Sequence, residues 1–156
     1  MTSKFIAMSL ALFVGFVSLH AQELLIFKKV DFFEMEGEDE KKRDARLVLD
    51  PVLEVLTLSD EKKGAEKVTY ASIPYTHITK IVYERSAHRR YKSGLFVTPW
   101  LLFSKGKKHW LTVEFKDVAQ FPQGFVYVRL DKENYRRVLS ALEAGTGLEI
   151  EEIIES

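Results

Sequence analysis

The sequence predicts a mainly β fold with one C-terminal helix: a bent antiparallel sheet or partial barrel of six to seven strands, capped by the helix. Short apolar or alternating segments recur from residue 45 to residue 130, and turn residues separate them. A single amphipathic stretch follows at residues 131–144. One helix of about three turns cannot cover a whole open sheet, so we expect it to close one end of a strongly bent one.

The first 21 residues have the pattern of a secretory signal peptide. Lys4 supplies the positive start, residues 5–19 are almost wholly apolar, and Ala21 is the small residue before the expected cut. These 15 apolar residues fall short of the roughly 20 that span a bilayer as a helix. We therefore expect export to the periplasm or the extracellular space. The alternative is an uncleaved anchor that keeps the protein membrane-associated, because Leu19 is a poor residue for cleavage.

The composition excludes several classes of function. The chain has no cysteine, which excludes thiol catalysis, thiolate metal sites and a lipoprotein anchor. It has 23 basic and 23 acidic residues, and removal of the signal peptide with Lys4 leaves a net charge of −1. No overall field attracts nucleic acid, and no nucleic-acid partner is expected.

The strands are predicted from apolar runs and alternation. Residues 22–44 are expected to form an N-terminal strand, within 23–33, and then a charged linker over 34–44. The remaining strands are expected at residues 45–50, 52–58, 68–73, 77–84, 109–116 and 124–130. In the segment 109–116, Leu111, Val113 and Phe115 should share one face of the sheet.

The helix has recognisable ends and one apolar face. Asp131 is a good N-cap, and Tyr135, Val138, Leu139 and Leu142 recur at helical spacing. Gly145 or Gly147 is expected to end the helix. In the tail, residues 148–156, the apolar part 148–154 is either a last strand or a frayed extension of the helix.

Three stretches resemble a group of uncharacterised exported bacterial proteins with a pleckstrin-homology-like (PH-like, GRAM-like) domain. They are IPYTHITKIVYERS at 73–86, KKHWLTVEFKD at 107–117 and LDKENYRRVLSALEAGTG at 130–147, and the resemblance covers residues 45–147. It implies a binding or scaffold domain rather than an enzyme. If residues 47–55 join the first two strands, that junction carries no Lys or Arg. This departure argues against the inositol phospholipid binding of better-known PH domains.

The most unusual segment is the basic-aromatic segment, residues 85–109. Its centre, residues 94–103, has only Thr98 as a polar side chain, and seven cations flank it without an acid between Glu84 and Glu114. Apolar and aromatic side chains bordered by cations are typical of contact with a membrane surface or a partner. The candidate contact residues are Arg85, Arg89, Arg90, Tyr91, Lys92, Leu95, Phe96, Trp100, Leu101, Phe103, Lys105, Lys107 and Lys108. The alternative is that this apolar run is another core strand or a helix turn.

No other motif indicates catalysis or a cofactor. His77, His88 and His109 lack the spacing of a metal-binding motif, so they are expected to be structural, and no metal or cofactor is expected. Ser86 and His88 lie two residues apart without a nucleophile elbow, which argues against a hydrolase. We therefore do not expect an enzyme.

The sequence favours a non-enzymatic binding or scaffold domain of the cell envelope that contacts a membrane surface or an envelope protein through residues 85–109. One alternative is a lipocalin-like carrier, in which the same apolar residues line a pocket for a small hydrophobic ligand. Another is a structural subunit that oligomerises through this segment. The oligomeric state itself does not follow from the sequence.

Overall fold

The computed structural model describes residues 23–36, 39–61, 68–86, 107–118 and 124–154. Eight strands, a 3-10 turn and one helix make up these residues, and the eight strands form one open sheet in the order β4-β3-β2-β1-β7-β6-β5-β8. The signal-peptide prediction for residues 1–21 lies outside the described residues. No helix among the described residues has the length and apolar character needed to cross a membrane.

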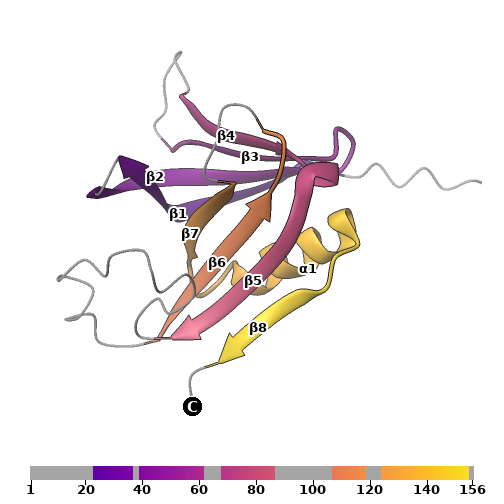
Figure 1. Cartoon of the computed structure of the whole chain (residues 1–156). Helices are drawn as coiled ribbons and strands as arrows, with labels where there is room; N and C mark the ends of the chain where they lie inside the picture. The colour runs from indigo at the N-terminus through magenta and orange to yellow at the C-terminus, as the bar shows by residue number, and fades with distance from the viewer. Residues whose placement is uncertain (1–22, 37–38, 62–67, 87–106, 119–123, 155–156) are drawn as a thin grey trace, which may run out of the picture.

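The first half of the sheet consists of two long strands and two short ones. They are β1 (Leu25–Glu36), β2 (Asp39–Asp50), β3 (Val55–Asp60) and β4 (Thr69–Pro74). The second half consists of β5 (Ile78–Ser86), β6 (Lys108–Phe115), β7 (Phe125–Leu130) and β8 (Ile150–Ile154). Only three residue pairs, from Asp31↔Arg129 to Phe33↔Tyr127, join β1 to β7, and the two halves cross steeply at this seam (Figure 1).

The sheet differs from the prediction in strand number and direction. It has eight strands rather than six or seven, and it stays open, so no barrel closes. The tail, whose conformation the sequence left undecided, is strand β8, which pairs with β5 in parallel from Ile81↔Ile150 to Arg85↔Ile154. The parallel direction follows from the path of the chain, because α1 carries it back to the end of the molecule where β5 begins (Figure 1).

The charged run 34–44 is not a linker, and this part of the prediction was wrong. It forms the far ends of β1 and β2, which pair continuously from Val30↔Ala45 to Glu36↔Asp39. Cross-strand ion pairs stabilise this hairpin, such as Arg43 Nε with Glu34 Oε2 at 2.5 Å. The junction of the first two strands is therefore residues 37–38, not 47–55, and basic residues stand close to it on β2. The argument from a junction without Lys or Arg therefore no longer holds.

The helix α1 (Tyr135–Thr146) covers the concave face of the sheet. Asp131 caps the preceding turn, since its Oδ1 accepts hydrogen bonds from the backbone N–H groups of Glu133 (2.7 Å) and Asn134 (2.8 Å). Gly147, with φ 69°, ends the helix in the left-handed region. Three residues of the predicted stripe, Val138, Leu139 and Leu142, are buried, and Tyr135 is half-buried.

The main core lies between α1 and the concave face of both halves of the sheet. Leu111, Val113 and Phe115 contribute to it together, which confirms the predicted alternation of β6. Trp110 points to the opposite face, where it forms a second buried cluster with Phe33 and Tyr127. Phe33 and Trp110 have ring centroids 5.5 Å apart. Both faces of this part of the sheet are therefore buried.

Candidate functional site

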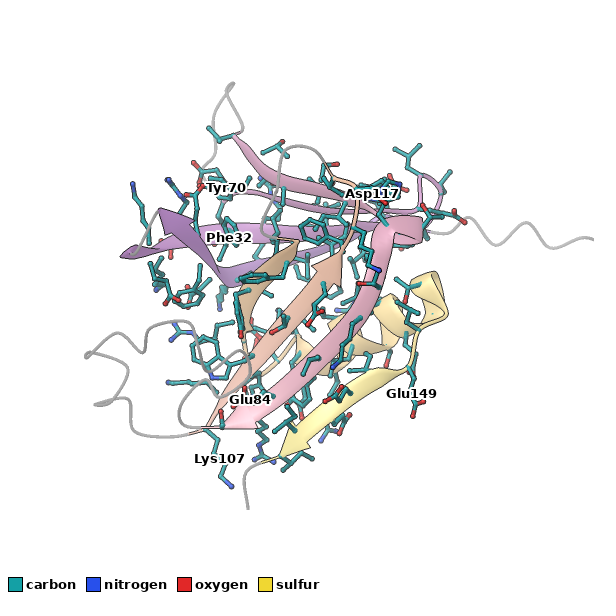
Figure 2. The ribbon with its side chains drawn as sticks, viewed as in Figure 1. Phe32, Tyr70, Glu84, Lys107, Asp117 and Glu149 are labelled. Atoms are coloured by element: carbon teal, nitrogen blue, oxygen red, sulfur yellow. The ribbon has the colours of Figure 1, made fainter. Side chains whose placement is uncertain are left out.

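The structure describes three of the thirteen predicted contact residues, at the end of the hairpin formed by β5 and β6. Arg85 and Lys107 are exposed and Lys108 is half-buried. Ser86 pairs with Lys108 and Arg85 with His109, so the two ends of the basic-aromatic segment lie side by side (Lys107 in Figure 2). The other ten predicted residues lie outside the described residues: Arg89, Arg90, Tyr91, Lys92, Leu95, Phe96, Trp100, Leu101, Phe103 and Lys105.

A charged groove of about 560 Å³ lies beside this hairpin end. Residues from β1, β2, β6, β7 and the turn before α1 meet there, although they are distant in the sequence. The basic residues of its lining are Lys29, Lys107, Lys108, Arg129 and Lys132, and the acidic ones are Asp31, Asp44, Glu61 and Asp131. Of these, the sequence analysis had singled out only Lys107 and Lys108 as contact residues.

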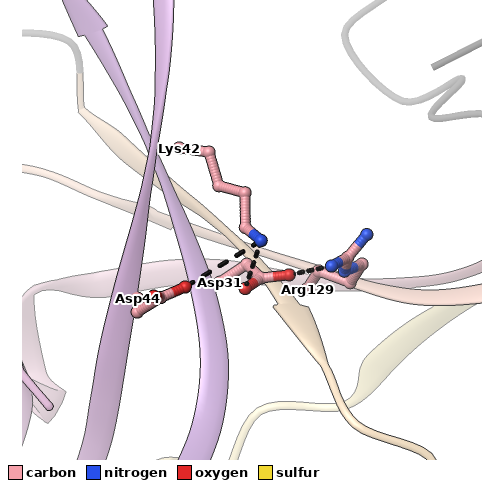
Figure 3. A network of polar contacts seen from close by, with 4 residues as sticks. All are labelled: Asp31, Lys42, Asp44 and Arg129. Carbon is pink, nitrogen blue, oxygen red and sulfur yellow. Dashed lines mark ion pairs between the residues drawn. The ribbon is translucent and has the colours of Figure 1, made fainter. Parts of the chain in front are cut away.

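Three of the four acids in the groove are engaged within the protein. Asp31 forms ion pairs with Arg129 and with Lys42, whose Nζ lies 3.1 Å from Oδ1 (Figure 3). Asp131 accepts the two backbone hydrogen bonds that cap the turn before α1. Asp44 lies on the rim, with its side chain 79% exposed and 3.9 Å from Lys42. The lining carries five cations and four carboxylates, so its formal charge is +1 and the groove is only weakly positive.

Lys29 reaches the groove through an irregularity in β1. The pairing of β1 with β2 shifts register between Phe27 and Val30, and Lys29 has a φ of 57°. A residue with a side chain rarely adopts this left-handed conformation, and β-bulges of this kind redirect side chains. Nothing in the local sequence indicates the bulge, because Lys28 and Lys29 fit a regular strand equally well.

A stack of three rings stands at the same end of the molecule. The His109 ring lies 3.9 Å from that of Tyr135, and Tyr83 stacks on Tyr135 with centroids 5.6 Å apart. The Tyr83 hydroxyl lies 2.7 Å from His109 Nδ1, and Arg136 Nε donates to the Tyr135 hydroxyl at 2.9 Å. These side chains come from β5, β6 and α1, so the stack fixes the start of the helix against the sheet.

The electrostatics of the stack favour neutral rings. Burial raises the pKa of Tyr83 to about 12. Burial, together with the nearby Arg85, lowers the pKa of His109 below its usual value. The hydrogen bond therefore joins a neutral phenol to the Nδ1 of a neutral imidazole, and neither group is activated as a nucleophile. His109 packs in the ring stack and also borders the groove.

A second groove, of about 810 Å³, runs between α1 and β8. Tyr83 and Tyr135 border it together with Arg85, one of the predicted contact residues. Close by, Ser86 Oγ donates to Glu84 Oε1 at 2.6 Å, and both side chains are buried. Within the described parts of the chain, no three His, Asp or Glu side chains cluster as metal ligands would. Charged side chains line both grooves at this end of the described structure.

Comparison with known proteins supports the fold. No protein-family profile and no curated protein sequence matches the chain. A solved structure, that of the Spt16D Pob3N heterodimer, is similar with a TM-score of 0.50 at 10% sequence identity, over 86% of this chain. This chain spans about half of its neighbour's length, 56% of that chain. The neighbour has a PH-like fold. The open eight-stranded mixed sheet with one helix is therefore similar to a PH-like fold, as the resemblance implied.

Proposed function

We propose that the chain is a non-enzymatic binding domain of the cell envelope that attaches to an anionic membrane surface through the basic-aromatic segment. The observation that carries this proposal is the gathering of Arg85, Lys107 and Lys108 with Lys29 and Lys132 at one end of the sheet. These cations lie at or beside the two ends of the basic-aromatic segment, whose centre is apolar. Near an anionic bilayer each would contribute about 1 kcal/mol.

The location follows from the predicted signal peptide. Residues 1–21 would direct the protein to the periplasm or the outside of the cell, where envelope lipids are the available surface. Cytoplasmic phosphoinositides and nucleic acids are absent from that compartment. The run 34–44 at the β1–β2 junction carries six acidic residues against Lys41, Lys42 and Arg43, so it does not favour recognition of an inositol headgroup.

Co-sedimentation with vesicles tests this proposal. The protein should sediment with phosphatidylcholine vesicles that contain a third of phosphatidylglycerol, and salt should weaken this binding, because charges at the surface are screened. Lys107→Glu/Lys108→Glu should reduce binding at least tenfold. Lys28→Glu/Lys116→Glu is the matched control, because it makes the same charge change at exposed lysines outside the groove. Equal loss in both variants, or no binding by the wild type, would contradict the proposal.

A protein partner is the second candidate, because the similar solved structure is that of a heterodimer. A partner protein would bind through the same end, with Trp100 and Phe96 as the apolar contacts expected from the sequence. The two candidates predict different results for Trp100→Ser/Phe96→Ser. Loss of vesicle binding in this variant favours the membrane. Unchanged vesicle binding, together with loss of the crosslink to an envelope protein, favours the protein partner.

A further inference from the structure

Four apolar side chains are exposed together at the end of the molecule opposite the basic-aromatic segment. Val52 and Leu53, in the turn between β2 and β3, are 71% and 72% exposed. Leu24 and Ile26, at the start of β1, are 50% and 48% exposed. Leu25 pairs with Leu49 and Ile26 with Val48, so the start of β1 lies beside the end of β2 from which this turn leaves. We call these four residues the apolar tip.

The turn holds its two apolar side chains in a fixed position. Asp50 Oδ1 accepts hydrogen bonds from the backbone N–H groups of both Val52 and Leu53, each at 2.9 Å. Glu54 follows with a φ of 53°, and its carbonyl accepts a hydrogen bond of 2.8 Å from the Tyr75 N–H. A residue with a side chain keeps this left-handed conformation only where the surroundings impose it. The turn is therefore preorganised, although burial of Val52 and Leu53 contributes little to the fold.

An apolar groove of about 440 Å³ extends the apolar tip toward the helix. Leu25, Leu49 and Pro51 line it from the sheet side, and Tyr75 and Ala141 from the side of the 3-10 turn (Tyr75–His77) and α1. The groove adjoins the tip through Leu25 and Pro51, which are sequence neighbours of Leu24 and Val52. Exposed apolar surface of this kind marks contact with another apolar phase.

We propose that the apolar tip contacts the hydrocarbon edge of a zwitterionic lipid bilayer. The strongly apolar residues 5–19 end four residues before Glu23, which borders the apolar groove. In the uncleaved alternative residues 5–19 stay in the bilayer, and the four backbone steps from Leu19 to Glu23 reach at most about 14 Å, so that bilayer lies within reach of the tip. Glu23, Asp50 and Glu54 surround the tip and disfavour an anionic surface. The lipid contacted here is therefore different from that proposed for the basic-aromatic segment.

The geometry separates the two contacts. The 12-residue helix α1 begins beside His109, near the basic-aromatic segment, and ends beside Tyr75, near the apolar tip (Figure 1). A helix of this length spans about 18 Å. The two ends of the domain can therefore engage different surfaces, and the contact at the tip does not depend on the proposed function of residues 85–109.

Single-cysteine labelling tests this inference, because the chain has no cysteine of its own. The full chain carrying Leu53→Cys with an environment-sensitive fluorophore is reconstituted in phosphatidylcholine vesicles in 1 M salt, and its N-terminus is read by mass spectrometry. Ile154→Cys is the matched control, because Ile154 is 60% exposed at the far sheet edge. Nitroxide-labelled lipid should quench the label at position 53 about threefold more than at position 154, since interfacial side chains insert about 5–10 Å.

A second variant separates lipid contact from other causes. Val52→Ser/Leu53→Ser removes apolar surface from exposed positions, so the fold should persist while the label, moved to Ile26→Cys, loses most of its quenching. Equal quenching at positions 53 and 154 overturns the inference, whether or not residues 1–21 remain attached. So does a dimer that Val52→Ser/Leu53→Ser dissolves, because that result assigns the tip to a second copy. Vesicles without anionic lipid keep this test independent of the basic-aromatic segment.

Discussion

The Tyr83 hydroxyl lies 2.7 Å from His109 Nδ1, across two neighbouring strands and 26 residues apart in the sequence. This contact joins the ring stack to the base of the basic-aromatic segment, because Arg85 and His109 are directly paired residues of β5 and β6. The lowered pKa of His109 favours a neutral imidazole in this contact near neutral pH. The stability of this end of the molecule should therefore depend on the protonation of His109.

The first prediction concerns acid pH. The pKa of His109 is lowered in the folded state, so the unfolded chain binds a proton first as the pH falls below about 6.5. The stabilising contribution of neutral His109 is full above that pH and is lost as the pH falls toward the folded pKa. Urea unfolding at pH 5 and pH 7.5 should show a smaller pH effect in His109→Gln than in the wild type. His77→Gln is the control variant. An equal reduction of the pH effect in His77→Gln would contradict the assignment of this effect to His109.

The second prediction concerns the hydroxyl of Tyr83. Tyr83→Phe removes the hydroxyl that bonds His109 Nδ1, so it should change the titration of His109 and cost about 1 kcal/mol of unfolding free energy. Histidine NMR titration and urea unfolding measure the two effects. In the wild type the pKa of Tyr83 is about 12, so absorbance at 295 nm should show a late-ionising tyrosine that Tyr83→Phe removes. An unchanged His109 titration in this variant would show that the hydroxyl does not control the imidazole.

The third prediction concerns the close contact of α1 with the 3-10 turn. A Cβ added at Gly145 would lie 2.6 Å from Cε2 of Tyr75, a ring that is 6% exposed. Gly145→Ala should therefore destabilise the fold by about 1–3 kcal/mol, although alanine favours a helix. Tyr75→Leu in the same chain should recover part of the loss, because it removes the clashing atoms. Thermal unfolding of the two single variants and the double variant measures this coupling, and simple additivity would exclude the contact.

The fourth prediction concerns the ion pairs of Asp31. Its side chain is 14% exposed and it binds both Arg129 and Lys42 (Figure 3). Asp31→Asn should cost about 1.5–3 kcal/mol, since a charged acceptor of partly buried hydrogen bonds is lost. Asp44→Asn is the matched control. That carboxylate is 79% exposed and 3.9 Å from Lys42, so its loss should cost less than about 1 kcal/mol. Denaturant unfolding of both variants should separate them, and similar values would refute a special role for Asp31.

The strands were predictable wherever apolar residues alternate or run together. Alternation correctly placed Leu111, Val113 and Phe115 in the main core, and the helical stripe identified Val138 and Leu142. The prediction of a linker at residues 34–44 was wrong because charged residues can also form a strand. Ion pairs then join them to the neighbouring strand, as Arg43 is joined to Glu34. That signal exists only once the two strands are paired. The site was predictable only in part: the cations of residues 85–109 are visible in the sequence, but their gathering with Lys29 and Lys132 is not.

The β-rich class and the closing helix with its glycine end follow from the residue order, which also predicts export. Each depends on residues within a few positions of one another, which share one strand face, one helix face or one terminal segment. The tertiary structure alone decided the parallel pairing of β8 with β5, the bulge at Lys29, the contact of Tyr83 with His109, and the apolar tip at Val52 and Leu53. These features depend on which distant backbones pair and which surfaces remain uncovered. No local pattern in the sequence indicates which distant strands pair or which surfaces stay exposed.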